Sequence, residues 1–155
     1  MPLAHIEHYL IAADDMAKTR DWYCSVLGMQ EGPHPDFGFP VHWLYLDGRD
    51  VVHIGASAKQ AGENQKVYLG RTSQDTGSGT GAIDHIAFRA TGLAAMLANL
   101  RSRGVEFSER CASSQSPYQL FLYDPNGIKV ELNFHADEAV GLEPEVNAEN
   151  FARDW

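Results

Sequence analysis

The sequence repeats itself, and this repeat constrains the fold more than any other feature. Residues 6–15 (IEHYLIAADD) match residues 83–92 (IDHIAFRATG) at an offset of 77 residues. Residues 44–54 (LYLDGRDVVHI) match residues 122–132 (LYDPNGIKVEL) at an offset of 78 residues. A chain of 155 residues that contains two copies of one pattern predicts one compact domain, or two small halves that share a core.

Each half contains the same succession of predicted elements, a strand, a helix and further strands, which indicates an α+β fold. In the first half these are a strand over residues 4–12, a helix over 16–28 and a hairpin over 42–55. In the second half they are a strand over 82–90, a helix over 93–105 and a hairpin over 116–134. The polar residues 58–81, which end in GSGTG, predict a linker between the halves.

Four side chains that can bind a metal fall at equivalent positions of the repeat. His8 aligns with His85 in the first strand of each half, and His53 aligns with Glu131 in the last strand. A single histidine in an apolar strand is more often a hydrogen-bonded core residue. Four potential ligands at repeat-equivalent positions favour a metal site between the halves. Three imidazoles and one carboxylate suit divalent iron, manganese, nickel or zinc.

Composition narrows the classes of partner. The chain has 12 Lys and Arg against 21 Asp and Glu, a formal net charge of −9, so its surface repels nucleic-acid phosphates and anionic membranes. The two cysteines have no metal-type spacing and are too few for a disulfide scaffold. With no apparent signal peptide and no apolar run near the roughly 20 residues of a membrane span, we expect a reduced, cytoplasmic, soluble protein.

Three segments resemble the vicinal oxygen chelate superfamily, which groups glyoxalases, extradiol dioxygenases, fosfomycin-resistance enzymes and bleomycin-binding proteins. They are IEHYLIAADDMAKTRDWYCSVLGM, GAIDHIAFRA and YQLFLYDPNGIKVELNF, distributed over residues 3–134. The resemblance implies two pseudo-symmetric βαβββ modules whose sheets form one open, barrel-like metal site. It also implies a homodimer with a small-molecule substrate. The expected domain is 1–135, with module one at about 1–75, module two at about 81–135, and an acidic tail at 136–155.

The resemblance also implies roles for the four candidate ligands. His8, His85 and Glu131 match the three metal ligands of the family, and His53 matches the position of a fourth ligand in glyoxalase I relatives. With three ligands the site is a facial triad, typical of Fe(II) and oxygen activation, so Fe(II) is favoured over zinc, nickel or manganese. With His53 as a fourth ligand, fewer coordination positions stay open, and the site favours redox-neutral Lewis-acid chemistry. In a glyoxalase-like enzyme, His53 would be either this fourth ligand or the base.

The reaction class therefore stays open between an oxidoreductase and a lyase. We favour an extradiol-type dioxygenase acting on a small aromatic or vicinal-oxygen substrate. A glyoxalase-like lyase or isomerase that uses His53 is the first alternative, and a bleomycin-resistance-type binding protein without catalysis is the second. Typical extradiol enzymes have a tyrosine where this chain has Phe121, and glyoxalase I has a carboxylate where it has His53.

Aromatic residues near the motifs predict the wall of a substrate pocket. The candidates are Phe37, Phe39, Trp43, Tyr45, Tyr118 and Phe121. Few basic residues lie near the motifs, which disfavours anionic substrates such as glutathione, coenzyme A or phosphonates. An apolar or aromatic substrate such as a catechol fits this composition better.

Overall fold

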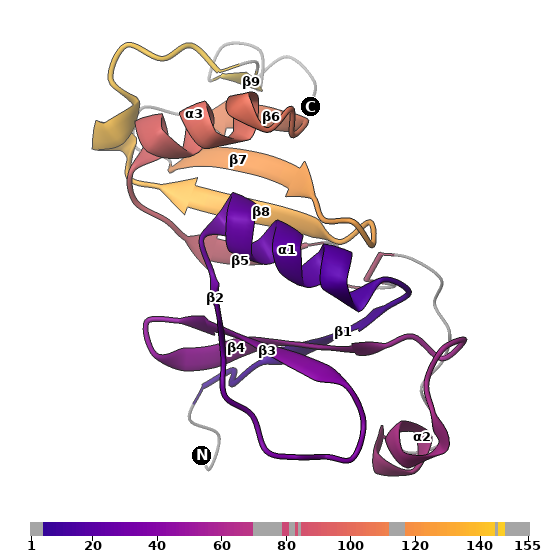
Figure 1. The fold of residues 1–155 in the computed structure, drawn as a ribbon. Helices are drawn as coiled ribbons and strands as arrows, with labels where there is room; N and C mark the ends of the chain where they lie inside the picture. The colour runs from indigo at the N-terminus through magenta and orange to yellow at the C-terminus, as the bar shows by residue number, and fades with distance from the viewer. Residues whose placement is uncertain are drawn as a thin grey trace. The chain divides into compact units, whose positions relative to one another are not determined.

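The chain forms two units, residues 1–77 and 78–155, and each has its own mixed β-sheet (Figure 1). A computed structural model describes residues 5–69, 79–80, 83, 85–111, 117–144 and 146–147. We call the two units module one and module two. Each follows the order βαβββ, which confirms the predicted α+β fold of two such modules.

Module one is a four-stranded sheet in the order β1-β4-β3-β2. Its elements are β1 (Tyr9–Ala13), α1 (Met16–Leu27), β2 (Gln30–Gly32), β3 (Val41–Leu46), β4 (Arg49–Ala56) and α2 (Glu63–Leu69). β1 and β4 run parallel, whereas β4, β3 and β2 are antiparallel neighbours. The helix α1 contacts β2, β3 and β4 and covers one face of this sheet.

The sequence explains the boundaries of α1 and of the β3–β4 hairpin. Asp15 caps α1 by accepting a hydrogen bond from Lys18 N, and Gly28 ends it in the left-handed conformation with φ of 74°. Asp47 and Gly48 form the hairpin turn with φ values of 50° and 74°. Two positive φ angles are typical of the turn that matches the twist of paired strands, so the predicted hairpin is confirmed.

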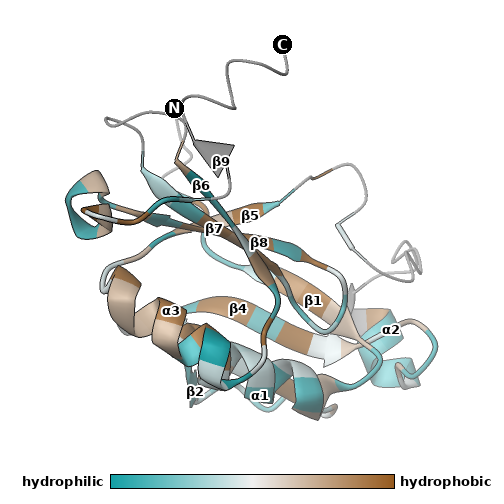
Figure 2. Ribbon diagram, turned by 90° about the horizontal axis from the view of Figure 1, so that it is seen from above, coloured by the Kyte–Doolittle hydropathy of each residue, from teal (hydrophilic) through white to brown (hydrophobic). Residues whose placement is uncertain are grey.

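Module two repeats this arrangement in the order β5-β8-β7-β6, with β9 added beside β6. Its elements are β5 (Ile86–Arg89), α3 (Leu93–Ser102), β6 (Phe107–Cys111), β7 (Tyr118–Tyr123), β8 (Lys129–Phe134), the 3₁₀ helix η1 (Ala136–Ala139) and β9 (Val146–Asn147). Figure 2 shows that α3 is largely hydrophobic, whereas α1 mixes polar and apolar residues. Leu93, Leu97 and Leu100 are the buried residues of α3.

Three sequence-based expectations need correction. The strand predicted over 4–12 is shorter, since β1 begins at Tyr9 and His8 precedes it. The segment 58–81, predicted as a linker, contains the helix α2. The acidic segment after residue 135, where the sequence shows no period, contains η1 and β9, although residues 148–155 lie outside the described part.

In the described part of the chain, no helix is long and apolar enough to cross a membrane.

Candidate functional site

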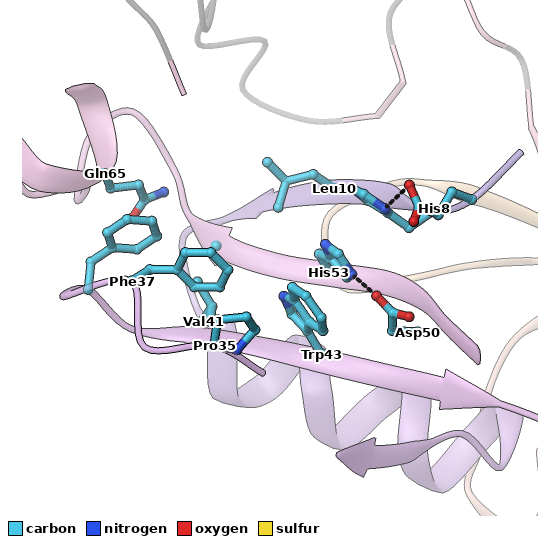
Figure 3. Close-up of a pocket in the computed structure, with 12 residues that line it drawn as sticks. His8, Leu10, Pro35, Phe37, Val41, Trp43, Asp50, His53 and Gln65 are labelled. Carbon is cyan, nitrogen blue, oxygen red and sulfur yellow. Dashed lines mark hydrogen bonds and ion pairs between the residues drawn. The ribbon is translucent and has the colours of Figure 1, made fainter. Parts of the chain in front are cut away.

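In module one, His8 and His53 form a stack of rings together with Trp43 (Figure 3). His53 lies in β4, where it is paired with Leu10 of β1 and Trp43 of β3. The ring centroids of His8 and His53 are 3.7 Å apart with an interplanar angle of 20°, and those of His53 and Trp43 are 4.1 Å apart with an angle of 3°. His53 is therefore held between two flat neighbours.

His53 is held in one tautomer by a carboxylate. Its Nε2 lies 2.9 Å from Oδ2 of Asp50. Burial lowers the pKa of His53, against the opposing effect of the Asp50 hydrogen bond, and the hydrogen bond from His53 lowers the pKa of Asp50. Both shifts favour a neutral imidazole beside a charged carboxylate. Because a carboxylate only accepts hydrogen bonds, Nε2 carries the hydrogen and Nδ1 carries the lone pair.

A β-bulge brings Asp50 to the face of His53. Residues three apart in a regular strand point to opposite faces of the sheet. Between β3 and β4 the register shifts, because Leu44 pairs with Val52 whereas Tyr45 pairs with Asp50, which leaves Val51 as the extra residue. The extra residue reverses the alternation, and Asp50 and His53 meet on one side.

The stacked rings border a cavity of about 370 Å³ within module one. Its apolar lining consists of Leu10, Pro35, Phe37, Phe39, Val41 and Trp43, and the remaining lining residues are Glu7, His8, Asp50, His53, Gly55 and Gln65. The residues 33–40, which carry both phenylalanines, are held to β3 by a hydrogen bond of 2.6 Å from Tyr45 Oη to Pro33 O. A volume of this size suits a small organic ligand with an aromatic body.

In module two, His85 and Glu131 form the corresponding pair. Nε2 of His85 lies 2.8 Å from Oε2 of Glu131, whose side chain is 7% exposed. The other oxygen, Oε1, accepts a hydrogen bond of 2.7 Å from Nε2 of Gln119. The amide of Gln119 is oriented in turn by Nε of Arg110, which donates to its Oε1 over 2.8 Å. The carboxylate of Glu131 is thus fixed from two sides.

The two pairs occupy equivalent places in their sheets. His8 immediately precedes β1 and His85 immediately precedes β5. His53 and Glu131 each lie in the strand between the first strand of the module and its antiparallel neighbour. Within each module, the two candidate ligands of that module are in contact.

The four candidate ligands are of residue types that bind divalent metals, but the orientation of the His8 and His53 rings limits how these two can bind together. The lone pair of an imidazole lies in the plane of the ring, so a bound metal lies in that plane too. The planes of His8 and His53 are nearly parallel, and the two rings do not direct lone pairs at a common point. Among the described residues, no three side chains of His, Cys, Asp or Glu are grouped to hold a metal ion. This stacking disfavours joint coordination by both histidines.

The other predicted pocket residues lie outside this cavity. The ring of Tyr45 lies against Gly32, and Tyr45 is not among the lining residues. Tyr118 is 1% exposed in module two, and its hydroxyl donates to Glu109 over 3.1 Å. Phe121 is half-buried in β7 of module two.

Sequence reasoning missed Asp50, Gln65 and Gln119. The spacing of Asp50, three positions before His53, could have indicated the contact, because a bulge between two such residues brings them to the same face of a strand. Gln65 lies in the segment predicted as a linker, where no pattern marked it. Gln119 lies opposite Asn133 in the β7–β8 register, and its role depends on the cross-strand contact with Glu131.

Solved structures share this fold at low sequence identity. An antibiotic-binding protein from Streptomyces sp. CB03234, TnmS3, is 18% identical with a TM-score of 0.61, over 87% of this chain and 98% of that one. The fosfomycin-resistance protein FosX from Listeria monocytogenes is 17% identical with a TM-score of 0.60, over 85% and 93%. A lactoylglutathione lyase from Agrobacterium tumefaciens is 18% identical with a TM-score of 0.62, over 88% and 97%.

At this level of sequence identity, the similarity shows a shared fold and does not extend to function, since the three proteins differ in function. No curated protein sequence gives a significant match to this chain. The family model described as Glyoxalase/Bleomycin resistance protein/Dioxygenase superfamily matches residues 5–132, which is most of the sequence. The chain therefore belongs to the glyoxalase/bleomycin resistance protein/dioxygenase superfamily, the vicinal oxygen chelate superfamily.

Proposed function

We propose that this protein is a divalent-metal-dependent enzyme that acts on a small aromatic substrate with two neighbouring oxygens. His8, His85 and Glu131 would hold the metal, with Fe(II) favoured over zinc, nickel or manganese. His53 would be the catalytic base. The reaction that we favour is extradiol-type dioxygenation.

One observation carries this proposal. Burial lowers the pKa of His53, and its ring is held by Asp50 and stacked on Trp43 at the wall of an aromatic cavity beside His8. Its Nδ1 lone pair suits the removal of a proton from a substrate hydroxyl. Its stacking on His8 supports a base role for His53 over a fourth-ligand role, which leaves a triad of two histidines and one carboxylate.

Each residue has a defined task in this scheme. The aromatic rings of Phe37, Phe39 and Trp43 would hold the substrate ring and exclude water. His53 Nδ1 would accept a hydroxyl proton, and Asp50 would stabilise the imidazolium that forms. A divalent metal in such a site supplies positive charge that stabilises the substrate oxyanion. Ring cleavage would break the carbon–carbon bond beside the two oxygens and place both atoms of O₂ in the product.

A redox-neutral lyase or isomerase reaction is the second candidate. The observation that favours it is the His53–Asp50 pair itself, since a positioned neutral base can move a proton without any oxidant. A ligand-binding protein without catalysis is an outcome that the experiments must distinguish from both reactions.

Metal analysis of purified variants tests the ligand assignment. We expect stoichiometric metal in the wild type and its loss in His85→Ala. The control is His135→Ala, because that side chain is 74% exposed and lies outside the proposed set. We expect His53→Ala to retain metal and lose turnover. Full metal content in His85→Ala, or loss of metal in His53→Ala, would contradict the assignment.

Reaction assays separate the candidates. Oxygen uptake that depends on Fe(II) and a catechol supports the dioxygenase. Oxygen-independent turnover of a hemithioacetal with Ni(II) or Zn(II) would replace it with the lyase. Tight binding of aromatic ligands to metal-free protein, with no turnover under any metal, would replace both with a binding protein.

A further inference from the structure

The cavity of module one has two chemically different ends (Figure 3). The ionisable side chains of the lining gather at one end, where His8, His53 and Asp50 lie. Gln65, an uncharged residue from α2, lies at the opposite end. Apolar and aromatic side chains separate the two. A ligand that fills this space meets acid–base groups at one end and an amide at the other.

Gln65 is buried and its amide is positioned by the backbone. The residue is 2% exposed, and its Nε2 donates a hydrogen bond of 2.7 Å to Ala56 O. The amide lies directly over Gly55, where an added Cβ would stand 3.1 Å from Nε2. The absence of a side chain at Gly55 therefore lets the amide approach the strand without a tight contact.

The helix that carries Gln65 is also connected to the aromatic wall. Asn64 Nδ2 donates to Gly38 O over 3.3 Å, between the two phenylalanines of the 33–40 segment. Phe37 and Phe39 have ring centroids 5.7 Å apart. The amide of Gln65 and these rings are consequently held in one arrangement.

The hydrogen-bonding capacity of Gln65 exceeds its bond to Ala56. A primary amide has two N–H groups and an oxygen with two lone pairs, and among the described residues the structure gives Gln65 that single bond. A buried amide is costly unless its polar atoms find partners. A ligand group that both donates and accepts hydrogen bonds would supply them.

The charge of the lining limits the ligand further. The ionisable residues among the lining side chains are acidic residues and histidines, and none is Lys or Arg. An anionic group would have no cationic partner there and would be repelled by Glu7 and Asp50. A cavity of about 370 Å³ is also of the size that takes a ligand larger than one bare ring.

We infer that Gln65 determines substrate specificity and that the substrate is an uncharged aromatic diol with a hydrogen-bonding substituent on the ring, remote from its two oxygens. A carboxamide or a hydroxyl group has the required chemistry. This inference rests on the proposed function for the diol end, and on Gln65 and Gly55 alone for the substituent end.

Calorimetric titration of the full chain with matched catechols tests the inference. The probes are 3,4-dihydroxybenzamide, 4-isopropylcatechol, which has a similar shape without polar atoms, and the anionic 3,4-dihydroxybenzoate. An apolar group placed against the amide would cut off its remaining hydrogen-bonding atoms from water, and this cost predicts about a tenfold preference for the amide over the isopropyl compound. We expect the anion to bind more weakly than the amide.

Variants assign the preference to the amide of residue 65. Gln65→Leu should reduce it to within about twofold, because leucine cannot form hydrogen bonds. Gly55→Ala should also reduce the preference with Gln65 still present, since the new methyl group presses on the amide and shifts it by a few tenths of an ångström. Lys66→Leu, the same substitution at an exposed neighbour, should keep the preference. Circular dichroism checks that each variant is folded.

The outcomes separate this inference from the proposed function. Equal affinity for the amide and isopropyl catechols in the wild type, or an unchanged preference in both Gln65→Leu and Gly55→Ala, would overturn the inference alone. Tighter binding of the benzoate would do the same. Failure of every catechol to bind would overturn the proposed function together with the inference.

Discussion

Replacement of Asp124 should destabilise module two by breaking the turn between β7 and β8. Asp124 is 5% exposed, and its Oδ1 accepts hydrogen bonds of 2.8 Å from both Asn126 N and Ile128 N. The turn is also closed by the backbone bond from Asp124 N to Ile128 O, at 3.0 Å. One carboxylate oxygen thus accepts hydrogen bonds from two backbone donors of the turn.

The magnitude follows from these two donors. In Asp124→Ala, the buried Ile128 N–H loses its acceptor, whereas Asn126 N–H is nearer to solvent and can bond to water. A hydrogen bond to a charged group contributes about 1.5–3 kcal/mol, and an unsatisfied buried donor costs about 1–3 kcal/mol. Because these two descriptions overlap, we expect a total loss of about 2–4 kcal/mol in the free energy of unfolding.

Asp124→Asn is the matched control. The amide keeps an oxygen at the same place but loses the charge, so we expect a loss of about 1 kcal/mol. Urea unfolding followed by far-UV circular dichroism measures both losses as shifts in midpoint at constant slope. A loss below about 0.5 kcal/mol in Asp124→Ala, or equal losses in the two variants, would refute the role of the acceptor oxygen.

Three further outcomes are expected. Gln119→Leu should weaken metal affinity about tenfold, because the substitution removes the hydrogen-bond donor to Glu131 Oε1. Competition with a chelator measures the affinity, and an unchanged value contradicts the prediction. Glu138→Ala should cost about 1 kcal/mol of unfolding free energy, since Glu138 Oε2 accepts hydrogen bonds from Gly92 N at 2.7 Å and Leu93 N at 2.9 Å at the start of α3. Urea unfolding measures this loss, and a shift within error contradicts the cap. Burial raises the pKa of the Cys24 thiol, so iodoacetamide at pH 8 should modify it more slowly than free cysteine, and equal rates would show that the thiolate is not disfavoured.

Local sequence predicted the elements whose boundaries depend on neighbouring residues. The helix α1 begins at an aspartate cap and ends at a glycine, and both signals act within one turn of the chain. The two-residue turn at Asp47 and Gly48 fixes its hairpin in the same way. In module two, the DPNG turn identified β7 and β8, because Asp124 forms its bonds within four residues.

Elements that depend on distant partners were predicted less well. The alternation of apolar residues continues from Ile6 to Leu10, yet β1 begins only at Tyr9, where pairing with Val52 of β4 begins. The limits of a strand depend on where its partner strand begins and ends, and the alternation of residues within one segment does not show where the partner lies. The short helix α2 was missed because Gln65, the buried one among the α2 residues whose side chains the structure describes, is polar.

The sequence by itself determined the repeat and the four residues that it aligns, His8, His53, His85 and Glu131. A repeat is visible in the sequence because both modules use the same order of elements and the same strand register. From that register, the pairing of each histidine or glutamate with its neighbour within a module follows.

Only the tertiary structure decided what surrounds those residues. The extra residue Val51 turns Asp50 toward His53, and the hydrogen bond between them sets the tautomer of the imidazole. Gly55 leaves space for the amide of Gln65, which arrives from a helix that the sequence pattern did not indicate. Both contacts depend on where a strand lies against another element of the same chain. The distances between such elements are set by how they pack, and the local sequence does not contain them.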